Sequence, residues 1–195
     1  MGKTVLYIDG ENLRHYVENV LTGRGIIKSK ASILNLDLEL LFKKVLKGIR
    51  ISQKIYYASK LRFHKETPRK SQQLIQEQRV LKTRIEKTGF KFIISGNVRA
   101  QIVRTNKKPK VVFKEKGVDV KIAVDLVSAA CDKKTETVIL CSSDSDLQPA
   151  VKEVKRRRAE IIYLGFEISP NKGLMYTTDR TILIRNSEIL DCLRD

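Results

Sequence analysis

The chain alternates short apolar segments of high β propensity with longer amphipathic segments whose apolar residues recur every three or four positions. This alternation predicts parallel strands joined by helical crossovers, because each parallel strand needs a connection that returns along a face of the sheet. We expect strands at residues 5–8, 51–58, 90–94, 137–141, 160–164 and 181–185, and helices at about 13–21, 38–46, 69–87, 119–132, 147–158 and from 187. The predicted fold class is α/β with a central, mostly parallel sheet.

Three longer segments interrupt this pattern. Residues 22–36 and 165–180 carry glycines without a clear apolar period, which predicts loops. Residues 95–116 place two β-prone stretches around the polar turn at 106–109, which predicts a basic hairpin. Hydrophobic residues make up 42% of the 195 residues, enough for a sizeable core, and no linker or repeat divides them. We expect a single domain over residues 1–195.

Basic residues outnumber acidic ones by 39 to 22, which gives a formal net charge of +17. A charge of this size predicts attraction to polyanions, of which nucleic acid is the commonest inside a cell. A charge that serves only solubility is the alternative.

The composition also narrows the kinds of site and compartment. Three widely separated cysteines and two histidines argue against a disulfide framework and against a tetrahedral zinc site. The sequence has no apolar run of about 18 residues and begins without the pattern of a signal peptide. We therefore expect no membrane segment and a reducing, cytoplasmic location, and any metal ion would be held by oxygen ligands.

Acidic side chains follow two of the predicted strands, at the edge where parallel α/β sheets bind ligands. Asp9 comes directly after the first strand, Asp144 and Asp146 follow the strand at 137–141, and Asp119 opens a predicted helix. Each could be an ordinary cap or turn residue, but their joint occurrence predicts one acidic pocket. Carboxylates that lie so near one another repel unless a cation lies among them. We therefore expect a Mg²⁺ or Mn²⁺ site.

Three motifs of the chain resemble those of NYN domain proteins of the LabA-like group, which belong to the PIN-like nuclease superfamily. The motifs are Tyr7-Ile-Asp-Gly-Glu-Asn12, Lys116-Gly-Val-Asp-Val120 and Ser142-Ser-Asp-Ser-Asp-Leu147. The resemblance covers nearly the whole chain and is weakest at residues 22–36 and 95–116. It implies a PIN-like three-layer α/β/α sandwich. It also implies a metal-dependent nuclease that hydrolyses phosphodiester bonds of RNA, with endoribonuclease as the expected activity.

The resemblance assigns the acids to a metal site. It implies that Asp9, Asp119 and Asp144 form a metal-binding triad, and that Asp146 is a fourth acid. A bound ion would polarise a phosphodiester, activate a water and stabilise the leaving 3′ oxygen. This chemistry needs no histidine base.

Other motif residues receive supporting roles. The resemblance implies that Asn12 orients a ligand or contacts the phosphate. Ser142 and Ser143 stand where the family often has small hydroxyl residues, and we expect both to contact the substrate. Asp125 lies about 240° around the predicted helix from Asp119, so both cannot face the pocket directly. We expect a structural or supporting role for Asp125.

Basic residues gather at places that could hold a phosphate backbone. The connection after the second predicted strand and the start of the next helix contain Lys60, Arg62, His64, Lys65, Arg69 and Lys70. The hairpin contains Arg99, Arg104, Lys107, Lys108, Lys110 and Lys116. We expect substrate contacts from both groups. A third group, at 152–158, falls at a helix C-terminus, where the helix dipole stabilises cations without any ligand.

Two aromatic residues fit a substrate with unpaired bases. Phe63 lies within the first basic group and Tyr176 lies in the loop at 165–180, and either could stack on a base or belong to the core. Single-stranded or structured RNA is the expected partner, because no recognition helix or zinc finger is visible. The helix at 69–87 and the hairpin are also candidates for the face of a homodimer.

Several competing functions share parts of this pattern. The first is a non-catalytic RNA-binding regulatory module that retains the acidic pocket. The second is another magnesium enzyme, but Asp9-Gly-Glu-Asn-Leu13 departs from the Asp-x-Asp-x-Thr of haloacid-dehalogenase-type phosphatases, and topoisomerase-primase domains need a Glu where the chain has Asp9. The third is a response-regulator-like receiver, whose acidic pair and lysine are not at the required strand ends.

Overall fold

The computed structural model describes residues 2–25, 32–65, 67–103, 110–132 and 135–194. Its centre is a six-stranded sheet in the order β3-β2-β1-β6-β7-β8, in which every neighbouring pair is parallel. These strands are β1 (Lys3–Asp9), β2 (Gln53–Ser59), β3 (Phe90–Ser95), β6 (Thr135–Cys141), β7 (Glu160–Phe166) and β8 (Arg180–Ile184). The expectation of a mostly parallel central sheet is confirmed.

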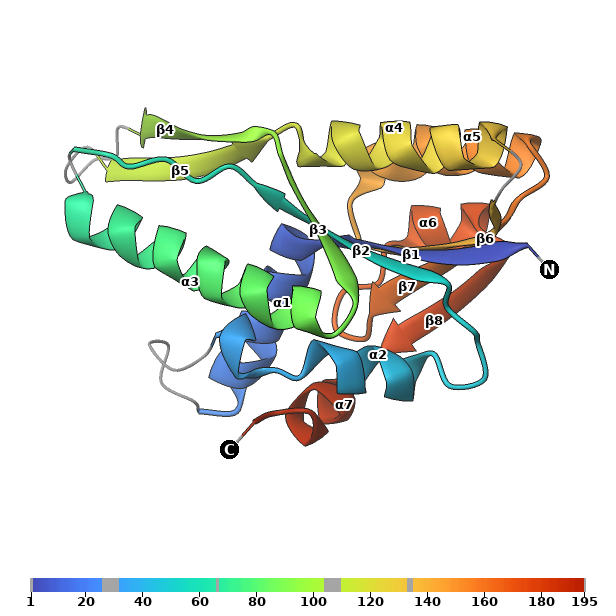
Figure 1. The fold of residues 1–195 in the computed structure, drawn as a ribbon, viewed down its shortest axis with the longest axis horizontal. Helices are drawn as coiled ribbons and strands as arrows, with labels where there is room; N and C mark the ends of the chain where they lie inside the picture. Colours follow the sequence, from blue (N-terminus) through green and yellow to red (C-terminus); the bar gives the residue numbers. More distant parts are fainter. Residues whose placement is uncertain (1, 26–31, 66, 104–109, 133–134, 195) are drawn as a thin grey trace.

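Helices cover both faces of the sheet, which gives three layers (Figure 1). One face carries α1 (Gly10–Gly23), α2 (Leu38–Val45), α3 (Pro68–Lys87) and α7 (Asn186–Asp191), together with the short 3₁₀ turn η1 (Ile33–Asn35). The other face carries α4 (Val118–Cys131), α5 (Gln148–Arg156) and α6 (Lys172–Thr177), with the 3₁₀ turn η2 (Ser145–Leu147) before α5. The predicted α/β/α sandwich is therefore the observed architecture.

Strand β1 shows why the central strands read as continuous apolar runs. Leu6 and Ile8 belong to the core beneath α1 and α2, whereas Val5 and Tyr7 belong to the core beneath α4 and α5. All four side chains are buried, because both faces of a parallel sheet are covered by helices.

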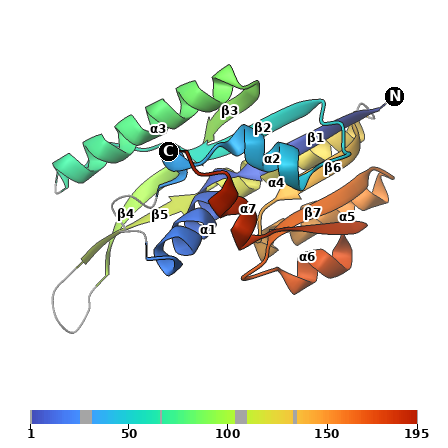
Figure 2. The same cartoon turned by 90° about the horizontal axis from the view of Figure 1, so that it is seen from below.

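A two-stranded antiparallel hairpin stands apart from the main sheet. It consists of β4 (Asn97–Val103) and β5 (Lys110–Lys116) and projects from the body of the molecule (Figure 2). Its two ends meet at Gly96 and Gly117, which have φ values of 67° and 96°. A Cβ atom at Gly96 would overlap the carbonyl oxygen of Lys116, so only glycine permits this close approach. The end of β3 and the start of α4 are thereby held side by side.

The structure differs from the sequence predictions at two places that concern the site. Helix α4 begins at Val118 with Gly117 as its N-cap, so Asp119 lies inside the first turn and does not cap the helix. The predicted loop at 165–180 contains α6, whose N-cap is Asn171. This helix has only six residues and includes Gly173, so it shows neither the length nor the propensity by which helices are recognised.

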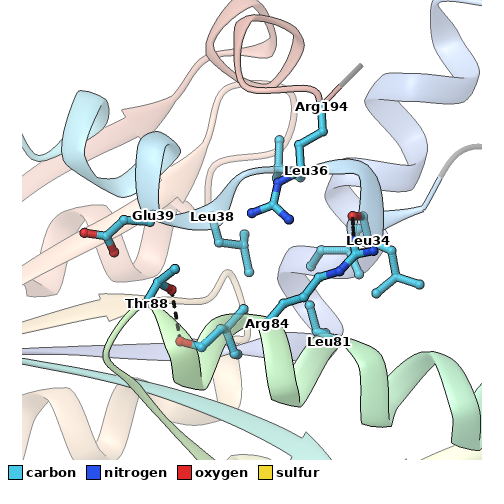
Figure 3. A pocket seen from close by; sticks show the side chains of 10 residues that line it. Leu34, Leu36, Leu38, Glu39, Leu81, Arg84, Thr88 and Arg194 are labelled. Atoms are coloured by element: carbon cyan, nitrogen blue, oxygen red, sulfur yellow. Dashed lines mark hydrogen bonds between the residues drawn. The ribbon is translucent and has the colours of Figure 1, made fainter.

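A small pocket between η1, the start of α2 and α3 has a volume of about 10 Å³ (Figure 3). Arg84 donates to the carbonyl oxygen of Leu34 at 2.8 Å and Arg194 donates to Asp37 at 3.3 Å, so both guanidinium groups attach neighbouring segments to each other. The space holds about one water, which identifies the pocket as a packing feature.

Within the described ranges, no helix has both the length and the apolar character needed to cross a membrane.

Candidate metal and nucleic-acid site

The strand order places the switch in chain direction between β1 and β6. The chain runs outward from β1 through β2 to β3, and then returns to the other side of β1 as β6. Ile8 pairs with Cys141, so Asp9 and Ser142 leave neighbouring strands at the same edge. Crevices at such switch points are where open α/β sheets bind ligands.

Three of the predicted acids converge at this edge. Asp119, Asp144 and Asp146 each contribute a carboxylate oxygen, and these atoms all lie within 4.8 Å of one another. Asp119 comes from the first turn of α4, whereas Asp144 is the N-cap of η2 and accepts from the backbone N–H of Asp146 at 2.9 Å. Asp119 and Asp144 are half-buried and Asp146 is exposed, so the group opens to solvent.

Asp9 is joined to this group through Ser142. One Asp9 oxygen accepts from the backbone N–H of Asn12 at 3.1 Å, and the other accepts from the Ser142 hydroxyl at 3.0 Å. The same hydroxyl accepts from the backbone N–H of Asp144 at 3.1 Å. Burial raises the pKa of the Asp9 carboxyl. The two hydrogen bonds act to lower this pKa, and the negative charge of Asp144 acts to raise it further. That Asp9 is itself a metal ligand stays a prediction.

Asn12 and the two serines organise the turn after β6. The side-chain oxygen of Asn12 accepts from the backbone N–H of Ser143 at 3.1 Å, which attaches the start of α1 to this turn. Ser142 is completely buried, and its hydroxyl is hydrogen-bonded to Asp9 and to the backbone N–H of Asp144, while its predicted contact with substrate stays a prediction. Ser143 is half-buried, and its predicted contact with substrate remains untested.

The donor set of the three acids fits a hard divalent cation. No lysine or arginine of the described segments forms a salt bridge with Asp119, Asp144 or Asp146, so these segments do not neutralise the three charges. Carboxylate oxygens are the ligands that Mg²⁺ and Mn²⁺ favour. The three acids could therefore hold such an ion.

Asp125 has a separate, structural position. It accepts from the hydroxyl of Tyr57 at 2.8 Å and pairs with Lys121 at 2.5 Å, one turn earlier on α4. Burial and the contact with Asp125 both raise the pKa of Tyr57. The helical geometry that separates Asp125 from Asp119 therefore directs it toward β2.

The first basic group lies on the carboxyl edge that carries the acids. Lys60, Arg62 and Lys65 are exposed in the connection after β2, and Arg69 and Lys70 are exposed in the first turn of α3.

The connection after β2 is bound to the hairpin. Arg62 donates to the side chain of Asn97 at 3.1 Å, and the backbone N–H of Val98 donates to the carbonyl oxygen of Lys60 at 3.2 Å. Lys116 is exposed at the end of β5, directly before Gly117, and Arg104 lies outside the described residues.

Sequence reasoning missed two polar residues that hold the acidic turn. The hydroxyl of Tyr163, in the middle of β7, lies 2.8 Å from the Ser143 hydroxyl. The side-chain nitrogen of Asn171 donates to the Ser143 carbonyl oxygen at 3.0 Å. In the sequence, Tyr163 has the pattern of a core residue in an apolar strand, and Asn171 lies in a segment predicted to be a loop. Neither residue therefore carried a local sequence signal for a role in the site.

Comparison with known proteins agrees with this architecture. A search of curated proteins finds no match. Among solved structures, the chain is similar to VPA0982, a protein of unknown function from Vibrio parahaemolyticus, with 20% sequence identity, a TM-score of 0.57 and coverage of 94% of this chain and 93% of that one. At this identity the similarity concerns the fold alone. The family model of the NYN domain matches residues 3–185. The chain therefore belongs to the NYN domain family, a family of PIN-like nuclease domains.

Proposed function

We propose that this protein is a metal-dependent ribonuclease that hydrolyses phosphodiester bonds of RNA. The observation that carries the proposal is the convergence of Asp119, Asp144 and Asp146, whose carboxylate oxygens lie within 4.8 Å of one another at the switch point of the sheet. Asp9 is the fourth acid of the proposed site, through its link to Ser142 and Asp144. Membership of a nuclease-type family supports the same chemistry.

The chain's own residues would hold Mg²⁺ or Mn²⁺ and place the substrate. Asp119, Asp144 and Asp146 supply hard oxygen ligands from two elements, and Asn12 keeps the turn of Asp144 against α1. A bound divalent ion supplies Lewis acidity at a phosphate oxygen and lowers the pKa of an attacking water. Binding of that ion is favourable, because a cation offsets the repulsion among the three carboxylates.

Basic residues at the rim would hold the phosphate backbone. Asp119 follows Gly117 by two residues, and Gly117 packs on Gly96. A Cβ atom added to Gly117 would lie 3.4 Å from the Cα atom of Gly96. Asn97 comes next and binds Arg62, so a short chain of contacts joins the acids to the first basic group.

The start of α3 supports the same reading. Arg69 and Lys70 occupy the first turn of this helix, which contains no acidic residue. Cations at a helix N-terminus are unfavourable because the dipole is positive there, and a bound phosphate would offset that cost.

The proposal includes finer features that follow from the same reading. The substrate is single-stranded or structured RNA, and cleavage is endonucleolytic. Residues 1–195 act as one NYN domain of the LabA-like group, and the protein works in the cytoplasm.

The decisive experiment is cleavage of an internally labelled, mixed-sequence single-stranded RNA in Mn²⁺, in Mg²⁺ and in EDTA. The variants are Asp119→Asn and Asp144→Asn, which keep side-chain size and remove one charge. Asp132→Asn is the matched control, because Asp132 is exposed and caps the far end of α4, about 20 Å from Asp119 along the helix. Internal cleavage that needs metal, fails in both site variants and survives in the control is the expected result.

Intact RNA under every metal condition would overturn the enzymatic proposal. If the protein still binds the RNA under those conditions, the non-catalytic binding module takes its place. Cleavage that persists in Asp144→Asn would show that the converging acids are not the reacting site.

A further inference from the structure

A buried tyrosine of β7 is bound to the turn that carries Asp144. The side chain of Tyr163 is 0% exposed, yet its hydroxyl makes two hydrogen bonds. It accepts from the backbone N–H of Asn171 at 2.9 Å and lies 2.8 Å from the hydroxyl of Ser143. The N–H of Asn171 can only donate, so the phenol oxygen accepts that bond, and either hydroxyl can be the donor between Tyr163 and Ser143.

Asn171 closes this arrangement into a ring of hydrogen bonds. Its side-chain nitrogen donates to the carbonyl oxygen of Ser143 at 3.0 Å, and its side-chain oxygen accepts from the backbone N–H of Leu174 at 3.0 Å as the N-cap of α6. With the bond from its N–H to Asn12, all three polar groups of Ser143 are engaged. The residue directly before Asp144 is therefore fixed by partners on α1, on β7 and at the start of α6.

Gly165 allows Tyr163 to reach this turn. Tyr163 pairs with Leu140, three residues before Ser143, so its ring has to extend along the strand direction to contact that serine. A Cβ atom at Gly165, two residues further along β7, would overlap the ring and hydroxyl of Tyr163. The space left by the missing side chain is the space through which the phenol passes.

We propose that Tyr163 is a positioning residue for the acidic site, and that it works by fixing Ser143 together with Asn171. This inference rests on the proposed function, since it concerns the same acids. Without a metal, the like charges of Asp119, Asp144 and Asp146 oppose their convergence. The hydrogen bonds of Ser143 hold the turn against that repulsion, so the site is assembled before the ion arrives.

The test is the affinity for Mn²⁺ alone, measured from the EPR signal of the free ion with no RNA present. Tyr163→Phe keeps the ring and removes only the hydroxyl. We expect its Kd for Mn²⁺ to rise about tenfold, in the range seen when groups that orient metal ligands are removed. Asn171→Ser, which retains a helix cap but is too short to reach Ser143, should weaken Mn²⁺ binding in the same way.

Tyr16→Phe is the matched control. Tyr16 is also buried, and its hydroxyl is also hydrogen-bonded, to the Ile184 carbonyl oxygen and to Asn186, but it lies on the other face of the sheet. This variant should lose stability yet keep the wild-type Kd for Mn²⁺. RNA binding in EDTA should be unchanged in Tyr163→Phe, because the basic rim is intact.

The outcomes separate this inference from the proposed function. Wild-type protein that binds no Mn²⁺ would overturn both. Wild-type protein that binds Mn²⁺ with the same Kd as folded Tyr163→Phe would overturn the positioning role alone. Equal weakening in Tyr16→Phe would also overturn it, since the effect would then come from a general loss of stability.

Discussion

The ring of Tyr56 lies against the backbone of Gly10, and its hydroxyl donates to the carbonyl oxygen of Gly10 at 3.1 Å. Gly10 directly follows Asp9 and is the first residue of α1. A Cβ atom there would overlap both the Tyr56 ring and the carbonyl oxygen of Tyr57. The glycine of this motif is therefore required by the packing of β2 against the start of α1.

Gly10→Ala should accordingly destabilise the protein. We expect a loss of about 1–3 kcal/mol in the free energy of unfolding, because the new methyl group has to displace backbone as well as a ring. Urea unfolding followed by circular dichroism measures this. Gly23→Ala, at the other end of α1 where nothing lies within 4 Å of the added atom, is the control and should be neutral or slightly stabilising. Equal stability of the two variants would contradict the packing argument.

Asp125 should matter for stability and not for metal binding. Asp125→Ala leaves the hydroxyl of the fully buried Tyr57 without its acceptor, which costs about 1–3 kcal/mol. Its Kd for Mn²⁺ should remain that of the wild type, in contrast to Asp119→Ala on the same helix. Calorimetric titration of both variants with Mn²⁺ makes the comparison. Loss of Mn²⁺ binding in folded Asp125→Ala would place Asp125 in the metal site.

Arg62→Ala should weaken RNA binding by several-fold and reduce the slope of log K against log salt by about 1, as expected for one lost phosphate contact. Filter binding in EDTA at several salt concentrations isolates this effect from cleavage. Arg180→Ala changes the net charge equally but lies at the start of β8, on the opposite edge of the sheet, and should leave the slope unchanged. Identical behaviour of the two variants would assign RNA attraction to overall charge.

Phe63 offers a direct optical test for base stacking. Its side chain is 52% exposed among the cations of the first basic group, and the chain contains no tryptophan. Phe63→Trp therefore introduces the chain's one tryptophan, which can be excited apart from the six tyrosines, and its emission should be quenched by single-stranded RNA and far less by a duplex of equal length. Phe63→Leu should lower the affinity for single strands by about tenfold. Emission that does not respond to bound single strands would show that no base stacks there.

Much of the site was predictable because its acids lie at the ends of helices and strands. Asp119, Asp144 and Asp146 lie at the ends of elements whose apolar pattern is plain, and parallel strands bring those ends to one edge. The contacts of Tyr163 and Asn171 with Ser143 were not predictable. They join residues 20 and 28 positions apart in the sequence, and they depend on which strand neighbours β6. No local pattern encodes that neighbour.

The role of Ser142 shows a second limit of the sequence. The small hydroxyl at this position predicts a group that meets the substrate, but only the register between β1 and β6 reveals that it is buried between Asp9 and Asp144. Burial of a polar side chain depends on what packs above it. In this case the hydroxyl bridges two acidic segments.

Asp119→Asn should change the thermal stability in opposite directions with and without metal. Without metal, the substitution removes one of three repelling charges, and we expect Tm to rise by about 1–3 °C, because a gain near 0.5–1 kcal/mol shifts a protein of this size by that amount. With Mn²⁺ at about 100 times its Kd, the free energy of unfolding of the wild type should increase by about 2.7 kcal/mol, which raises Tm by roughly 5–10 °C. The variant should not show this increase. Scanning calorimetry in EDTA and in Mn²⁺ measures both changes in Tm. Asp132→Asn, at the far end of α4, should follow the wild type in both conditions. If Asp119→Asn is destabilised without metal, Asp119 makes favourable contacts that outweigh the repulsion, and the acids are not held together against their charge.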